Sequence, residues 1–241
     1  MVNLSLKEIP RILLGTSPFI GAGQFGLRAL KYYENFYLNP SNIKKIVKKS
    51  FEAGIKGIQL LPFKPVINAV SELLEEGLNL KVLSTITSKG FKENLEEIEK
   101  LNPIAILLHA EIADRCNEAI LKDLFRRVRL KGYLTGFATH QPLKTLSWIK
   151  DTNLEYDIVM TPLNFTGEFI DGKLEDLIEI LKRLGKFIIA KKVLAAGKLK
   201  PKEALEYIAK LNFINAVALG VVSEKEIKET LMLAKKLLGE H

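Results

Sequence analysis

Eight short apolar runs recur along the chain and constrain its fold more than any other feature of the sequence. They cover residues 12–16, 57–61, 81–86, 104–109, 133–138, 157–161, 187–191 and 216–220, and from the second run onward they begin about 24 to 30 residues apart. That distance is enough for a strand, a helix and two loops. Most of the runs are apolar throughout, which is typical of parallel strands covered on both faces.

Helical patterns fill the intervals between the runs. Ser223 and Glu226, for example, have the spacing of a capping box ahead of the last apolar stripe. Strict alternation of eight strands and helices predicts an α/β fold, a (β/α)8 TIM barrel, as a single domain over residues 1–241. An open Rossmann-type sheet is the alternative, but it usually has fewer strands, and no G-x-G-x-x-G follows the first run.

Composition narrows the classes of protein to which the chain can belong. The formal charge of +8 comes mostly from lysines interleaved with glutamates, as in residues 224–229, so we expect solvated helix faces and no nucleic-acid partner. The apolar runs are far shorter than the roughly 20 residues of a membrane helix. The first residues lack a basic segment followed by an apolar stretch, so we expect a cytoplasmic protein with no membrane partner. The single cysteine, Cys116, is expected on a helix, and the abundant Lys, Glu and Ile predict a thermophilic source.

Residues 18–40 form a long, aromatic-rich loop after the first run in this prediction. The segment holds Phe19, Phe25, Tyr32, Tyr33, Phe36 and Tyr37. Because it follows a strand, it should lie on the face of the barrel where functional loops gather. It is either a lid over a pocket, with three glycines to let it move, or a contact surface in a homo-oligomer.

Polar residues at the carboxyl ends of the runs should converge on one mouth of the barrel. His109 ends the fourth run and is the first candidate for a catalytic group, because an imidazole titrates near neutral pH. A histidine that only bonds to a neighbouring loop is the alternative. The candidate residues for binding a small-molecule substrate are Thr16, Gln59, Glu111, His140 and Asn164, with Tyr32 and Tyr33 from the long segment.

Two lysines and two glycine-containing loops also lie at this mouth. Lys191 ends the seventh run and Lys89 follows the third, where a desolvated amine could form a Schiff base or neutralise an anion. Gly197, Gly220 and Ser223 lie in the last two loops, where backbone N–H groups can receive a phosphate. A metal centre is not expected, since the sequence has neither H-x-H on a strand nor H-E-x-x-H.

The order of these motifs resembles that of the aldo-keto reductase superfamily. The resemblance rests on LLGTSPF at 13–19, LLHA at 107–110, LTGFAT at 134–139, AGKL at 196–199 and ALGVVS at 218–223. It implies a TIM barrel that uses NADP to reduce carbonyl groups, with His109 as the active-site histidine and the last two motifs closing over the cofactor.

The sequence departs from the family where the family's catalytic tyrosine and aspartate are expected. Residues 58–64 read IQLLPFK and contain neither. Lys89 is offset by about one residue from the family's catalytic lysine, and Val222 stands near Ser223 where a basic residue would hold the extra phosphate of NADP. Three functions stay open. They are an oxidoreductase in which Tyr32, Tyr33 or His109 donates the proton, a cofactor-independent lyase or isomerase on a phosphorylated or carboxylated metabolite, and a non-catalytic binding barrel.

Overall fold

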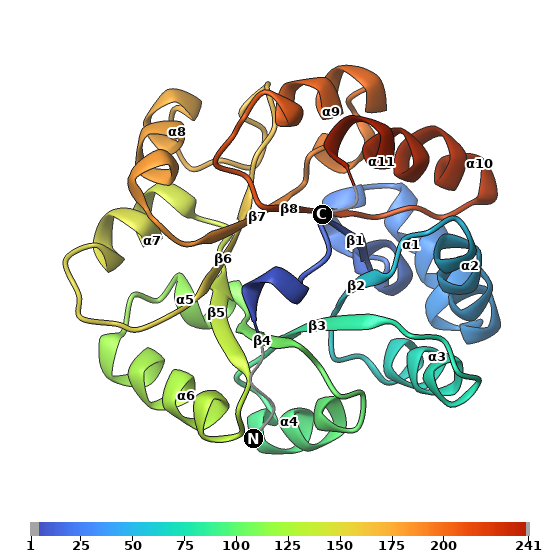
Figure 1. The fold of residues 1–241 in the computed structure, drawn as a ribbon, viewed down its shortest axis with the longest axis horizontal. Helices are drawn as coiled ribbons and strands as arrows, with labels where there is room; N and C mark the ends of the chain where they lie inside the picture. Colours follow the sequence, from blue (N-terminus) through green and yellow to red (C-terminus); the bar gives the residue numbers. More distant parts are fainter. Residues whose placement is uncertain (1–4, 240–241) are drawn as a thin grey trace.

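The strands form a closed parallel barrel in sequence order in the computed structural model, which describes residues 5–239. Their bounds are β1 (Ile12–Gly15), β2 (Gly57–Leu60), β3 (Lys81–Ile86), β4 (Ala105–Leu108), β5 (Leu134–Ala138), β6 (Ile158–Pro162), β7 (Phe187–Lys191) and β8 (Ala216–Leu219). Figure 1 shows the barrel end-on with its helices around it. The (β/α)8 barrel predicted from the sequence is confirmed, and every strand boundary lies within one residue of its apolar run.

Helices cover the outside of the barrel between successive strands (Figure 1). They are α1 (Arg28–Tyr32), α2 (Pro40–Glu52), α3 (Lys64–Glu75), α4 (Phe91–Glu99), α5 (Ala110–Ala113), α6 (Glu118–Leu130), α7 (Pro142–Ile149), α8 (Leu174–Arg183), α9 (Pro201–Ala209), α10 (Glu224–Glu226) and α11 (Met232–Leu238). A wider turn, Ile227–Leu231, joins α10 to α11. Several helices begin with proline in the first turn, where the missing N–H costs no hydrogen bond.

Alternation along each strand divides the apolar side chains into two layers. The inner layer fills the barrel with Leu13, Leu83, Leu107, Ile158 and Ile189. Their neighbours one residue away, such as Leu14 and Ile106, belong to the larger cluster between the sheet and the helices. Every second residue of a strand therefore faces the barrel axis.

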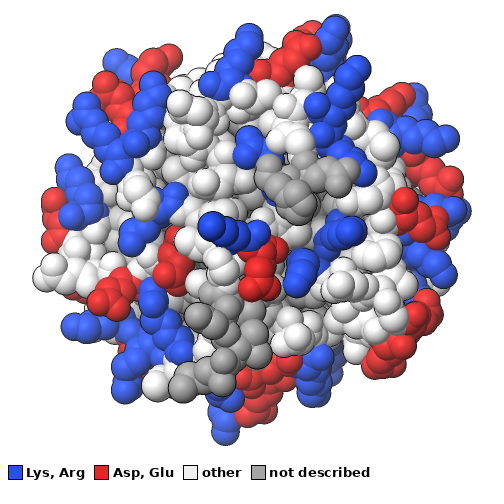
Figure 2. Space-filling model, viewed as in Figure 1, with Lys and Arg blue, Asp and Glu red and all other residues white. Residues whose placement is uncertain are grey.

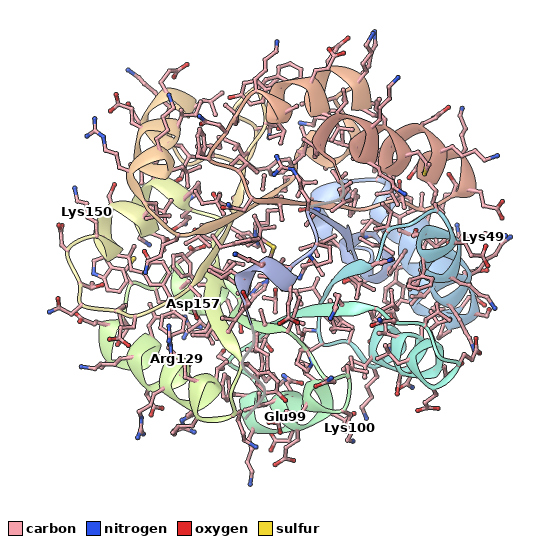
Figure 3. All side chains as sticks on the ribbon, viewed as in Figure 1. Lys49, Glu99, Lys100, Arg129, Lys150 and Asp157 are labelled. Atoms are coloured by element: carbon pink, nitrogen blue, oxygen red, sulfur yellow. The ribbon has the colours of Figure 1, made fainter. Side chains whose placement is uncertain are left out.

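The chain itself closes the amino ends of the strands. The turn Leu6–Glu8 lies across the centre of the near end in Figure 1, and Leu6 and Ile9 pack against the inner layer. At the rim, Asp157 accepts hydrogen bonds from Arg129 on α6 (3.1 Å) and from the backbone N–H of Thr135 (3.0 Å); Figure 3 labels Arg129 and Asp157. Lysines and arginines alternate with carboxylates over this end (Figure 2), as expected for a solvated surface. The opposite end is the one left to form a site.

The segment predicted as a long loop is instead a chain of short helical turns. It consists of Ser17–Ile20, Gly23–Phe25, α1 and Tyr33–Tyr37. Phe19 and Phe36 are buried with ring centroids 5.1 Å apart, and Phe25 meets Tyr32 at 5.2 Å. This aromatic packing orders the segment. Its inner face covers the barrel mouth, while Leu27 and Leu30 are exposed on its outer face.

The prediction that Cys116 lies on a helix is wrong. Cys116 is in the link between α5 and α6, with a φ of 53° in the left-handed region. The helix pattern breaks there because Asn117 is the N-cap of α6 and accepts a hydrogen bond from the N–H of Ile120 (3.1 Å). The sulfur is half-buried and lies 3.8 Å from the carbonyl of Asp114.

We expect Gly136→Ala to destabilise the barrel strongly. Gly136 pairs with Ile158 of β6, and a Cβ at residue 136 would overlap the backbone carbonyl of Ile158. The two strands must move apart, which should lower the free energy of unfolding in urea by about 2–4 kcal/mol. Gly23→Ala is the matched control, because a Cβ there meets nothing within 4 Å. Equal stability of the two variants would contradict the close approach of β5 and β6.

Candidate active site at the mouth of the barrel

A pocket of about 360 Å³ opens at the carboxyl ends of the strands, beneath the segment 17–38. This volume lies in the usual range for small-molecule and cofactor sites. The structure brings seven of the sequence-predicted site residues to its wall: Tyr32, Gln59, His109, His140, Lys191, Gly197 and Gly220. It does not bring Thr16, Tyr33, Lys89, Glu111, Asn164 or Ser223 to the wall.

Strand alternation explains which strand-end residues face the pocket. Leu107 belongs to the inner layer, so His109 also points inward, and Ile189 places Lys191 in the same way. Gln59, at the end of β2, is buried and donates from Nε2 to Thr85 Oγ1 (3.0 Å). These side chains therefore form one ring above the apolar interior of the barrel.

His109 is held in a defined tautomer. Its Nδ1 accepts a hydrogen bond from the backbone N–H of Glu111 (3.2 Å), because His109 is the N-cap of α5. An accepting Nδ1 carries no proton, so a neutral ring has its proton on Nε2. Burial lowers the pKa of His109 and the charge of Lys191 lowers it further, against the opposite effect of Glu111 and Asp114. The ring is therefore neutral at pH 7 and presents an N–H donor.

His140 lies beside His109, with ring centroids 5.6 Å apart and the rings nearly perpendicular. Loss of hydration lowers the pKa of His140, and the charges of Lys191, Lys192 and a protonated His109 act in the same direction. Asp114 positions this residue, because its Oδ2 accepts from the backbone N–H of His140 (2.9 Å).

Asp114 was missed by the sequence reasoning, since it follows a helix and not a strand. Its Oδ1 accepts from the hydroxyls of Thr139 (2.5 Å) and Thr145 (2.8 Å), so one carboxylate connects the ends of α5, β5 and α7. No signal in the sequence alone distinguishes it from other surface aspartates.

Lys191 is half-buried at the carboxyl end of β7. Burial lowers the pKa of Lys191 to about 7, with a further contribution from Lys192 and an opposing one from Asp114. An amine with this pKa exchanges a proton near neutral pH and is also nucleophilic there. Lys192, the next residue along the chain, lines the same pocket.

Arg28 is the other missed residue, and it comes from the segment over the mouth. Its guanidinium donates to the carbonyl of Ala196 in the loop after β7 (2.5 Å). A Cβ at Gly197 would lie 3.0 Å from the Arg28 guanidinium, so the absence of a side chain at Gly197 leaves room for this group. The contact joins the first strand's segment to the seventh strand's loop and closes one side of the pocket.

The predicted residues outside the wall have structural contacts instead. Thr16 Oγ1 accepts from the N–H of Leu61 (3.1 Å), and Tyr33 stacks on Tyr37 at 4.7 Å. Lys89 is exposed, and Ser223 Oγ accepts from the N–H of Glu226 (3.2 Å) as the N-cap of α10.

Glu111 and Asn164 likewise turn away from the wall. Glu111 Oε1 accepts from both the N–H (2.8 Å) and the hydroxyl (3.0 Å) of Ser88, and the Ser88 N–H is the main reason that the pKa of Glu111 is lowered. The buried amide of Asn164 bonds to Thr166, Glu168 and Lys192 within two adjoining loops.

Within residues 5–239, no three His, Cys, Asp or Glu side chains lie close enough together to hold a metal ion. Over the same residues, no helix is both long enough and apolar enough to cross a membrane.

Comparison with known proteins identifies the fold class but not a family. No protein-family model matches the chain, and neither does any curated protein sequence. Solved structures do match. A Pseudomonas aeruginosa protein assigned to the aldo-keto reductases shares 15% identity at a TM-score of 0.70, covering 98% of this chain and 94% of that one.

Two further solved structures match in the same way. An aldo-keto reductase of Bombyx mori in complex with NADP shares 14% identity at a TM-score of 0.60, covering 95% of this chain and 88% of the other. Aldose reductase from Giardia lamblia shares 10% identity at a TM-score of 0.63, covering 98% and 95% of the two chains. The chain therefore has the barrel fold found in aldo-keto reductases.

We expect Lys191→Met to stabilise the protein at low pH and to lose this effect as the pH rises. Below pH 7 both the folded and the unfolded chain hold the proton, and folding must bury the charge. Between the folded pKa of about 7 and the ordinary lysine pKa of 10.5, only the unfolded chain keeps the proton, so wild-type stability rises with pH. The gain in the free energy of unfolding from Lys191→Met should therefore be larger near pH 6 than near pH 10, by at least about 1 kcal/mol.

Urea unfolding at a series of pH values measures this difference. Lys150→Met is the matched control, since Lys150 is exposed on the outer rim (Figure 3), and its effect should not change with pH. A pH-independent effect at Lys191 would mean that its ammonium is hydrated in the folded protein.

Proposed function

We propose that the protein is a nicotinamide-dependent oxidoreductase that reduces the carbonyl group of a small metabolite at the barrel mouth. The convergence of His109 and Lys191 on one pocket carries this proposal. The fold shared with an aldo-keto reductase that binds NADP supports it. When bound, a reduced nicotinamide supplies a hydride to the carbonyl carbon.

His109 would orient and polarise the carbonyl group. Its Nε2–H donates to the carbonyl oxygen, because Nδ1 is already occupied by the N–H of Glu111. A neutral ring suits this role, since it holds its proton while negative charge develops on the oxygen. The lowered pKa of His109 keeps the ring in that form at neutral pH.

Lys191 would donate the proton that converts the alkoxide to an alcohol. Tyr32 and His109 also line the pocket, but Lys191 is the group whose pKa of about 7 matches proton exchange at neutral pH. Tyr33, another donor considered from the sequence, lies outside the wall. The proposed proton donor is thus on β7, whereas β2 contributes Gln59 to the pocket wall.

The pocket fits the body of a dinucleotide better than it fits the extra phosphate of NADP. Arg28 lies over Gly197, where a guanidinium can pair with a diphosphate. Glu226 and Glu229 also line the pocket, and their carboxylates would disfavour an additional phosphate group there. Glu226 Oε2 also accepts a hydrogen bond from the N–H of Val222 (2.9 Å), so this N–H is not available to bind an anion.

The first test is a titration of the protein with NADH and NADPH, followed by melting temperature and nicotinamide fluorescence. We expect saturable binding of both, with NADH tighter by about 10-fold, because two carboxylates repel the additional phosphate. Glu226→Gln should reduce this difference in affinity between NADH and NADPH. Glu224→Gln should not, because the Glu224 side chain lies outside the pocket and pairs with Lys45 (3.4 Å). No binding of either dinucleotide at about 1 mM would reject the oxidoreductase, and trapping of an amine adduct with borohydride would then support a Schiff-base lyase.

The proposed roles also predict how two variants behave. With NADH and a panel of small carbonyl compounds, His109→Ala and Lys191→Met should lower kcat by about 100-fold or more while leaving dinucleotide affinity within about 3-fold. His109→Ala should cost about 1 kcal/mol of stability, the usual value of an N-cap contact. Lys150→Met should change neither kcat nor the dinucleotide affinity. Full activity of Lys191→Met would assign the proton to another group.

A further inference from the structure

Lys192 has a backbone conformation that its side chain does not favour. Its φ is 55°, in the left-handed region, directly after β7 ends at Lys191. In a continuing strand, Lys192 would point away from the barrel axis when Lys191 points toward it. With the left-handed turn, both residues line the same pocket. Such strain in a residue other than glycine persists only where surrounding contacts hold it.

Asn164 supplies much of that support. The carbonyl oxygen of Lys192 accepts from Asn164 Nδ2 (3.3 Å) and from the N–H of Ala195 (2.9 Å). Asn164 is buried, and its Oδ1 accepts from the hydroxyl of Thr166 (2.8 Å) and the N–H of Glu168 (3.1 Å). The amide therefore fixes the loop after β6 against the loop after β7, and so positions Lys192.

The ammonium of Lys192 has an aromatic partner but no carboxylate partner. Its Nζ lies 4.3 Å from the ring centroid of Phe169, which itself has a φ of 66°. Across residues 5–239, neither Lys191 nor Lys192 forms a hydrogen bond or an ion pair with an acidic side chain. The nearby carboxylates of Glu111 and Asp114 are already bonded to hydroxyl and backbone N–H groups.

Half-buried cations without an anion are unfavourable, and an aromatic ring compensates only in part. The pocket thus maintains an uncompensated positive charge at a defined position. The pKa of Lys192 is lowered by burial, in keeping with an amine that lacks a counter-ion.

We propose that Lys192, beside Lys191, is a binding site for an anionic group, a carboxylate or a phosphate, on the small-molecule substrate. Lys192 fixes that group, which leaves Lys191 free to exchange a proton. The inference depends on the pocket alone and not on the cofactor, so it holds for a reductase or for a lyase.

Competitive acetylation of lysines, followed by mass spectrometry, tests the site directly. The probes are oxalate, inorganic phosphate and NADH, with chloride at matched ionic strength as the reference. We expect oxalate or phosphate at about 50 mM to slow the labelling of Lys192 at least about 5-fold. Labelling of Lys200, which is exposed in the following loop, should be unchanged. The more protective of the two anions identifies the chemistry of the substrate group.

Three outcomes would overturn the site. The first is that no probe slows the labelling of Lys192. The second is equal slowing at Lys200, which would report only electrostatic screening. The third is protection of Lys192 by NADH without protection by the small anions. The last result would assign Lys192 to the diphosphate of the cofactor. Failure of NADH to bind, with oxalate still protecting Lys192, would reject the oxidoreductase and leave the anion site intact.

Lys192→Gly separates the functional role from a structural one. Glycine adopts the left-handed turn without strain, so this variant should melt no lower than the wild type. The rise in melting temperature that oxalate or phosphate produces in the wild type should be lost in Lys192→Gly and retained in Lys200→Met. A variant that keeps this rise would show that Lys192 does not bind the anion.

Discussion

Hydrogen bonding between β1 and β8 closes the sheet, and the site depends on that closure. Ile12 pairs with Val217 and Leu13 with Ala218, so the first and last strands complete one ring. In a closed ring, the carboxyl ends of all eight strands meet at one mouth, and alternation sends every second side chain toward its axis. His109 and Lys191 lie far apart in the sequence and share a pocket only because the ring is closed.

The charged side chains at the barrel mouth fall into two groups, the carboxylates that hold the rim together and the titratable groups that face the pocket. Glu111 and Asp114 use their oxygens to fix Ser88, Thr139 and the backbone of His140. They are therefore unavailable to neutralise the lysines, and the pKa values of His109 and Lys191 fall because burial is not offset by an ion pair. Burial thus sets the direction of both pKa shifts, and the carboxylates of the rim oppose it only in part.

The sequence was sufficient for the strands and for part of the site. Apolar runs mark buried parallel strands, and counting alternate residues inward from Leu107 and Ile189 is enough to select His109 and Lys191. The remaining groups depend on tertiary structure. Lys192 enters through a left-handed turn that no local pattern indicates. Arg28 belongs to a segment whose fold depends on aromatic contacts, so its contact with Ala196 could not be inferred from the spacing of residues in the sequence.

The ring geometry also explains how a barrel of this fold can change its proton donor. The family that the sequence resembles has its tyrosine just after the second strand, where residues 58–64 of this chain read IQLLPFK and contain no tyrosine. A central substrate lies within reach of every strand end, so a donor on β7 can replace one on β2 without any change in the fold. Under the proposed mechanism, such a replacement would alter the chemistry, because a protonated lysine is a cation. A positively charged donor at the mouth would favour substrates that carry negative charge, and the proposed anion site at Lys192 would act in the same direction.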